Sequence, residues 1–152
     1  MQKEMQQHEQ LSELATFYVG DALCGIEIEQ IEEINRLSLM TRVPQAPANV
    51  LGILNLRGQI VTIIDLAGCL GLGTTETTPQ TRIIIVNRAG GKVGILVGRI
   101  SDVVAVDLMA QEPPPANMRG IQGGYFTGVC KRDKGLVGLL DLDRLLSADE
   151  ES

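Results

Sequence analysis

Residues Val61–Leu66 read VTIIDL, and the same pattern returns as VGLLDL at Val137–Leu142. The shared aspartates give an offset of 141 − 65 = 76 residues between the two copies. Each copy belongs to a nearly unbroken apolar run, Ile60–Ile64 or Leu136–Leu140, as expected of a strand buried on both faces. An aspartate at the end of such a strand can cap a following helix, which is worth about 1 kcal/mol. The short helices are expected at Leu66–Leu70 and Leu142–Leu146.

A second pair of similar segments precedes this one in each half of the chain. Cys24–Ile34 reads CGIEIEQIEEI and Val93–Val103 reads VGILVGRISDV, with an offset of 94 − 25 = 69 residues at the shared glycine. The order of the blocks is kept, which indicates a duplicated unit of roughly 70 residues, too long for a solenoid repeat. We expect two similar lobes within one domain, 14–146. The predicted parts are an N-terminal tail (1–13), a first lobe (14–72), a polar connector (73–80), a second lobe (81–146) and a C-terminal tail (147–152).

Each lobe is expected to consist of short strands with little helix. A hairpin is predicted at Gly20–Asp21, and another around Ala89–Gly91. Each hairpin is followed by a short amphipathic piece, Glu29–Ile34 or Gly98–Val103, that fits one helical turn or an edge strand. Several short strands in each half predict two small closed barrels packed together, an architecture without open strand edges. The hairpin strands are expected at Thr16–Val19, Leu23–Ile28, Ile83–Val86 and Val93–Val97.

Composition and charge narrow the class of protein. The 152 residues are 44% hydrophobic but only 3% aromatic, so the core of a single domain is expected to consist mainly of Ile, Leu and Val. The net charge of -6 argues against binding to nucleic acid and against a polybasic membrane anchor. No apolar stretch reaches the ~20 residues of a membrane helix, and Met1–Gln10 lacks the apolar core of a signal peptide. Three scattered cysteines, Cys24, Cys69 and Cys130, favour a reduced, cytoplasmic setting.

The sequence shows no catalytic or metal-binding set. The one histidine, His8, lies in the polar tail, where a solvated role is expected. The cysteines lack the paired spacing of a zinc site. Asp65 and Asp141 occupy matched positions in the two repeats, which favours helix capping over acid–base catalysis. We therefore predict neither enzyme activity nor a cofactor, and a small enzyme with Cys24 or Cys130 as its nucleophile is the distant alternative.

Arg57 is the conspicuous residue, because it interrupts the long apolar stretch Val43–Leu66. A buried unpaired guanidinium would be costly, so Arg57 must be paired or reach water. A planar donor held on an apolar base suits recognition of another protein's carboxylate or backbone, and an arginine paired within the scaffold is the alternative. Glu33 is of interest because it lies beside Ile31 on one short element, although the surrounding cluster of glutamates indicates a solvated face. The expected apolar base is Ile53, Leu54, Leu56, Ile60 and Val61.

Several segments together resemble the CheW-like coupling proteins of bacterial chemotaxis. The most specific of them is Gly52–Val61, GILNLRGQIV, which leads into Ile64–Leu66. The resemblance extends over about Leu14–Leu146, nearly the whole chain. The chain departs from the family pattern at Thr62, where a proline is usual, and near Cys24, where a larger side chain is usual. The weaker matching segments are Phe17–Asp21, Gly25–Ile28, Ile31–Ile34, Thr41–Pro44, Val93–Val97, Ile100–Val103 and Leu139–Leu142.

The resemblance implies a mainly β fold, with two SH3-like five-stranded β-barrel subdomains packed together and short helices. It implies a non-enzymatic adaptor that joins the cytoplasmic tips of methyl-accepting chemoreceptors to the regulatory domain of a CheA-type histidine kinase. Such an adaptor needs no cofactor, and it is cytoplasmic, held at the inner face of the membrane through receptor arrays rather than inserted in it. An adaptor of a different signalling array, controlling twitching or another output, is the nearer alternative. The family's partner contacts match Ile31, Glu33, Thr41, Gly52 and Arg57.

Overall fold

Strands make up most of the computed structural model, which describes residues 11–38, 40–43, 49–88, 91–115, 123–132 and 135–150. Within these residues, ten strands form two five-stranded sheets and the helices are short, which confirms the predicted fold class. The first sheet has the strand order β8-β1-β2-β10-β9, and the second sheet has the order β3-β6-β7-β5-β4. The strands of the first sheet are β1 (Leu11–Val19), β2 (Ala22–Glu27), β8 (Arg99–Asp107), β9 (Phe126–Arg132) and β10 (Gly135–Leu140). Those of the second sheet are β3 (Ile31–Arg36), β4 (Val50–Leu56), β5 (Gln59–Asp65), β6 (Arg82–Arg88) and β7 (Gly91–Val97).

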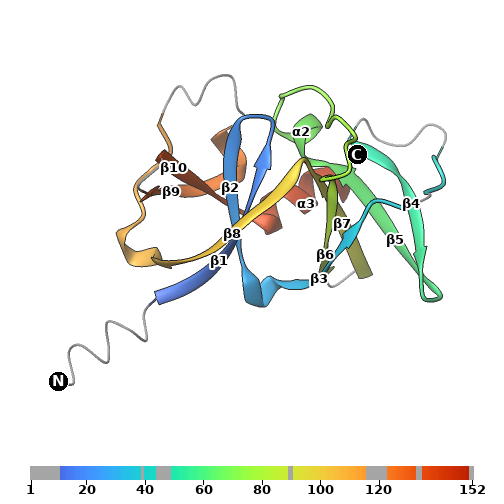
Figure 1. Ribbon diagram of the computed structural model, residues 1–152, viewed down its shortest axis with the longest axis horizontal. Coiled ribbons are helices and arrows are strands. Elements are labelled where there is room, and N and C mark those ends of the chain that lie inside the picture. The colour runs from blue at the N-terminus through green and yellow to red at the C-terminus, as the bar shows by residue number, and fades with distance from the viewer. Residues whose placement is uncertain are drawn as a thin grey trace.

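The two sheets are copies of one strand pattern. In the first sheet β2 pairs in parallel with β10, and Cys24 lies opposite Gly138. In the second sheet β7 pairs in parallel with β5, and Val93 lies opposite Thr62. The differences 93 − 24 = 69 and 138 − 62 = 76 are the two offsets of the sequence repeat. The repeat in the sequence therefore corresponds to a repeat in the structure, with β9 and β10 at the left end of the molecule in Figure 1 and β4 and β5 at the right end.

The sheets do not follow the expected division into lobes 14–72 and 81–146. The first sheet combines β1 and β2 from the start of the chain with β8, β9 and β10 from its end, while β3–β7 form the second sheet. Each sheet therefore contains a hairpin from one copy of the repeat and three strands from the other copy. Both copies present the same pattern and register, so the local sequence does not decide which copy completes a sheet. The connector 73–80 also packs against the second sheet, because Thr75 N and Oγ1 donate to the Asp65 carboxylate at 2.9 and 2.6 Å.

In each sheet, the chain that follows one outer strand forms a backbone bridge to the other outer strand. The chain that leaves β3 returns to β4, where Thr41 N donates to Ile53 O and Ile53 N donates to Thr41 O, both at 2.8 Å. In the first sheet, Glu112 N donates to Val129 O at 2.9 Å and Val129 N donates to Glu112 O at 2.7 Å. The bridges bring β3 toward β4 and β8 toward β9, so that each sheet curls around its own core.

Glycines at equivalent positions permit these bridges. A Cβ atom on Gly52 would overlap the carbonyl oxygen of Thr41, and one on Gly128 would overlap the residues around the Glu112 carbonyl. The two glycines are separated by the repeat offset, 128 − 52 = 76. Both are therefore explained by the close approach of two backbones.

The buried apolar side chains of the described residues form three clusters, one within each sheet and a larger one between the sheets. Two helices, α2 (Leu66–Cys69) and α3 (Leu142–Glu150), contribute to the cluster between the sheets and lie near the middle of Figure 1. This shared core joins the two sheets into one body. The second-sheet core is Leu54, Val61, Ile63, Ile83, Ile85 and Leu96, and the first-sheet core is Leu14, Val106, Cys130, Val137 and Leu139.

The predicted caps and edge strands are confirmed. Asp65 Oδ1 accepts from Ala67 N at 3.1 Å, and Asp141 Oδ1 accepts from Arg144 N at 3.2 Å. The two amphipathic pieces form the outer strands β3 and β8, and Gly20 adopts the positive φ of a hairpin turn. The remaining helices are single 3₁₀ turns, η1 (Ile28–Gln30), η2 (Leu108–Ala110) and η3 (Gly123–Tyr125).

Two expectations need correction. Helix α3 continues to Glu150 instead of ending at Leu146, so helical residues extend into the expected C-terminal tail. Ile60 is 58% exposed and Leu136 is 42% exposed, so β5 and β10 are not buried on both faces at these positions, and Thr62 of β5 is only half-buried. His8, most of the 1–13 tail and the turn at 89–90 lie outside the described residues. Among the residues that the structure describes, no helix is long and apolar enough to cross a membrane.

Candidate protein-binding site

Arg57 lies at the tip of the hairpin that joins β4 to β5. Leu56 pairs with Gln59, so Arg57 and Gly58 form a two-residue turn, with φ values of 51° and 84°. Positive φ at both central positions is the backbone of a type I′ turn, which matches the twist of the flanking strands. Asn55 Oδ1 accepts from Gly58 N at 2.9 Å and holds the turn closed. Among the described residues, Arg57 is the only non-glycine residue with positive φ, a conformation that costs about 1 kcal/mol.

The guanidinium of Arg57 is paired and exposed at the same time. Its Nη2 donates to Oε2 of Glu33 at 2.7 Å and to Oε1 at 2.9 Å. Asn35 Nδ2 also donates to Glu33 Oε1, at 2.9 Å. The hydrogen bond from Asn35 and the bond and charge of Arg57 lower the pKa of Glu33. The Arg57 side chain remains 66% exposed, so its other N–H donors are accessible to a partner.

Two apolar residues close to the ion pair in the sequence are also exposed. Ile34 follows Glu33 on β3, and Ile60 lies three residues beyond Arg57 on β5; both are exposed. Ile60 therefore belongs to the surface and not to the expected apolar base, whereas Leu54 and Val61 are buried beneath the hairpin as predicted. An exposed charged pair, on strands that also carry exposed apolar side chains, is typical of a protein-binding surface.

The repeat reproduces the apolar part of this surface but not its charges. Val103 and Leu136 stand at the positions of Ile34 and Ile60, since 103 − 34 = 69 and 136 − 60 = 76, and both are exposed. In the sequence, aspartates 102 and 133 stand at the positions of Glu33 and Arg57. The ion pair is therefore specific to the second sheet.

The five residues predicted from the resemblance fall into three places. Glu33 and Arg57 meet in the ion pair. Thr41 and Gly52 meet at the backbone bridge between β3 and β4. Ile31 is half-buried and packs against the core between the sheets. Arg57 is largely exposed and Glu33 is partly exposed. Thr41 is also exposed, while its backbone forms the bridge, and Gly52 and Ile31 have a role in the scaffold.

Sequence reasoning missed Ile34 and Ile60 as surface residues. The signal for Ile34 was available, because alternation along β3 turns it to the opposite face from Ile31 and Glu33. For Ile60 no such signal existed, since it continues an unbroken apolar run. Its exposure follows from its place next to the projecting turn.

Neither Cys24 nor Cys130 has the environment of a nucleophile. Cys24 is fully buried, and this burial raises the pKa of its thiol to about 12. Burial also raises the pKa of Cys130, against the opposing effect of Arg132. A nucleophilic cysteine requires the reverse, a lowered pKa and access to solvent. No group of three or more potential metal ligands occurs in the described part of the chain.

A β scaffold with a shared core and an exposed, charged hairpin tip defines a protein-binding module. Residues 13–150 match the family model described as the CheW-like domain, and the chain belongs to this family. It is a scaffold or adaptor protein of chemotaxis signalling and not an enzyme. This confirms the resemblance noted in the sequence.

Individual relatives agree with the family match. The chain is 34% identical to "Chemotaxis protein CheW" of Treponema pallidum over 142 residues, which cover 91% of this chain and 84% of that protein. It is 26% identical to "Protein FrzA" of Myxococcus xanthus over 136 residues, covering 88% and 84%. Among solved structures it resembles the scaffolding protein TtCheW from Thermoanaerobacter tengcongensis, with a TM-score of 0.80, 30% identity and coverage of 88% and 86%.

Proposed function

We propose that this protein couples the cytoplasmic tips of chemoreceptors to the regulatory domain of a CheA-type histidine kinase. It would act in the cytoplasm, at the inner face of the membrane, through receptor arrays. Membership of the CheW-like family supports the proposal, and the exposed Glu33–Arg57 pair on the β4–β5 hairpin is the observation on which it depends. The pair presents unused guanidinium donors in a fixed orientation, which suits a carboxylate or backbone carbonyl of a partner.

The mechanism follows from the joined sheets. Because the shared core makes them one body, a partner bound at one sheet is held in a defined geometry relative to a partner bound at the other. A shift in the receptor then biases the activity of the kinase, as a coupling free energy between two sites. Head-to-tail contacts of this kind can close into rings, and weak single contacts gain avidity in an array.

The five predicted positions take two kinds of role in this proposal. Arg57 and Glu33 contact the partner directly. Thr41 and Gly52 keep β3 and β4 in contact, so that Glu33 stays opposite Arg57. Ile31 anchors β3 in the core between the sheets.

Arg57→Ala tests the direct contact. The variant should fold normally but lose most co-sedimentation with a receptor tip fragment and the kinase, and with it the receptor-dependent change in kinase autophosphorylation. A loss of about tenfold in affinity is expected for one charge-assisted contact of about 1.4 kcal/mol. The control is Arg144→Ala, which removes an exposed arginine from α3. A folded Arg57→Ala variant that binds like the parent would contradict the role of Arg57, and absence of binding to both partners by the parent protein would overturn the proposal.

A second candidate function is an adaptor of a different signalling array. The observation that favours this second candidate is the match to Protein FrzA, a relative whose name differs from that of the chemotaxis protein CheW. A pull-down against a panel of purified receptor tips and kinase regulatory domains separates the two functions. Binding to components of the chemotaxis array supports the first, and exclusive binding to components of another array supports the second.

A further inference from the structure

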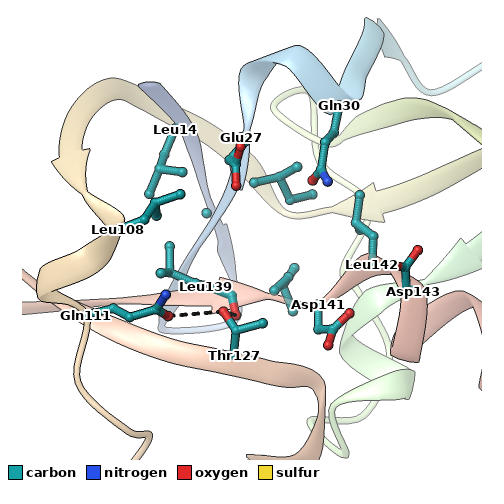
Figure 2. Close-up of a pocket in the computed structure, with 13 residues that line it drawn as sticks. Leu14, Glu27, Gln30, Leu108, Gln111, Thr127, Leu139, Asp141, Leu142 and Asp143 are labelled. Carbon is teal, nitrogen blue, oxygen red and sulfur yellow. Dashed lines mark hydrogen bonds between the residues drawn. The ribbon is translucent and has the colours of Figure 1, made fainter. Parts of the chain in front are cut away.

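A cavity of about 240 Å³ lies at one end of the first sheet, beside the start of α3. Its apolar wall is formed by Leu14, Leu108 and Leu139. Figure 2 shows Glu27 and Gln30 on one side of the cavity, with Gln111, Thr127 and Asp141 on the other. The cavity thus combines an apolar interior with polar groups that come from several separate elements.

Among the described residues of the second sheet, apolar side chains that pack in or against its core stand at the equivalent positions. Glu27 corresponds to Leu96, since 96 − 27 = 69, and Leu96 is only 3% exposed within the second-sheet core. Thr127 corresponds to Leu51, because each directly precedes the glycine of its bridge. Gln111 corresponds to Met40, because each directly precedes the residue that makes that bridge. Leu51 and Met40 both pack against the second-sheet core.

The comparison shows that the fold does not require polar groups here. The same strand pattern, with the same register, is completed in the second sheet by Leu, Leu and Met. In the first sheet, Glu27 is held in an environment that disfavours its charged form. Burial raises the pKa of Glu27, and the neighbouring Glu29 raises it further. Thr127 Oγ1 donates to Gln111 Oε1 at 3.2 Å, which leaves the amide N–H donors of Gln111 available. An open polar cavity in place of a filled apolar one indicates a binding role.

The charges around the cavity select the kind of occupant. Its described lining includes the carboxylates of Glu27, Asp141 and Asp143 and no lysine or arginine. Asp143 is already paired with Arg88, and Asp141 caps α3. Glu27 interacts with the like-charged Glu29, so among the described residues it is the lining carboxylate that has neither a positive partner nor a capping role. An occupant should therefore be a cation carried on an apolar stem.

The volume limits the size of this occupant. Pockets for drug-sized ligands have volumes of ~300–1,000 Å³, so a cavity of about 240 Å³ suits a single side chain. Arginine fits better than lysine, because its planar guanidinium is less strongly hydrated and can donate to acceptors on two walls at once. We propose that the cavity at the end of the first sheet is a docking pocket for one arginine side chain of a protein partner, with Glu27 as its main acceptor.

The pocket does not depend on the proposed coupling of receptor to kinase. It is lined by residues of β1, β2, β9 and β10 in the first sheet, whereas Arg57 is in the turn between β4 and β5 of the second sheet. Figure 1 shows β9 and β10 at the opposite end of the molecule from β4 and β5. The test below uses no receptor or kinase, so its failure would leave the proposed function untouched.

The test is an NMR titration of the full chain with N-acetyl-L-arginine N-methylamide. Saturable shifts are expected at the backbone amides of cavity residues such as Gly25 and Leu139. The corresponding citrulline compound, which is neutral but of nearly the same shape, should bind about fivefold or more weakly, because the hydrogen bonds then lack a charge. Equal binding of the two compounds, shifts that do not saturate, or saturable shifts confined to other parts of the chain would overturn the proposal.

Two variants make the test specific. Glu27→Gln should weaken the arginine compound about fivefold and leave the citrulline compound unchanged. Thr127→Leu, which installs the residue of the second sheet, should reduce binding of both compounds by filling the cavity. Glu76→Gln is the control, because it removes an exposed carboxylate of the connector. If both cavity variants fold and bind the arginine compound like the control, the pocket is assigned wrongly.

Discussion

At the scale of the residue, the two interpretations of Arg57 are compatible. From the sequence, Arg57 could either bind a partner or be paired within the scaffold. The structure has Arg57 paired through one nitrogen with Glu33 and still largely exposed. The ion pair orients the guanidinium without using up its donors, which lowers the entropy lost when a partner binds.

The pKa of Glu33 makes this pair testable by pH. Its pKa is lowered by the hydrogen bonds from Asn35 and Arg57, so the stabilising contribution of the carboxylate is fully present above its ordinary value of 4.5 and is lost as pH falls through the lower, folded-state value. Glu33→Gln should therefore be less stable than the parent at pH 7, and the difference should shrink below pH 4.5. Urea unfolding followed between pH 7 and strongly acid conditions measures it.

Glu76→Gln again provides the comparison for an exposed carboxylate. If Glu33→Gln is less stable than the parent by the same amount at all pH values, the loss of stability comes from the substitution itself and not from the charge of Glu33.

At the scale of the element, the two bridges explain why glycine stands before Ile53 and Val129. Each glycine lies against the backbone that returns from the opposite outer strand, so any Cβ must push the two apart. In the second sheet this contact also keeps β3 beside the β4–β5 hairpin, and hence Glu33 beside Arg57.

Gly52→Ala should open the bridge of the second sheet. The loss of two backbone hydrogen bonds, each worth about 1 kcal/mol, predicts a destabilisation of about 2 kcal/mol, measured by urea unfolding. Partner binding should fall as well, because Glu33 and Arg57 separate. Gly124→Ala is the matched control, since a Cβ there meets nothing within 4 Å.

Gly128→Ala separates scaffold damage from damage to the site. It should open the bridge of the first sheet and destabilise the protein by a similar amount, while the Glu33–Arg57 pair stays intact. If Gly52→Ala and Gly128→Ala reduce partner binding equally at temperatures where both remain folded, the bridge does not act through the ion pair.

At the scale of the whole molecule, the exchange of hairpins between the two copies makes the sheets interdependent. The first sheet needs strands from both ends of the chain, and both sheets line the shared core with α2 and α3. We expect a single unfolding transition, with probes in the two sheets giving the same midpoint.

Cutting the chain at the connector should leave neither half able to fold. Residues 1–76 contain β1 and β2 without β8–β10, and residues 77–152 contain β6 and β7 without β3–β5. Circular dichroism of each fragment should show little β structure, and mixing the fragments should restore it. A half that folds alone would show that the copies are independent lobes after all.

The sequence alone was sufficient to predict the duplication and the mainly β structure. It was also sufficient to predict the helix caps at Asp65 and Asp141 and to single out Arg57 as a surface residue. These follow from local patterns, because apolar runs, turn residues and capping aspartates act within a few residues of themselves. The family resemblance added the SH3-like, five-stranded form of the two barrels. It also pointed to Thr41 and Gly52, whose contact with each other the local pattern does not reveal.

Only the tertiary structure decided which copy completes each sheet, which partner Arg57 meets, and where the repeat leaves a cavity. Glu33 and Arg57 are 24 residues apart in the chain, and Cys24 lies opposite Gly138 across almost the whole sequence. Pairings of this kind depend on which of two nearly identical apolar surfaces is covered first and best. Since the two copies offer the same pattern, the choice between them rests on the packing of the entire shared core.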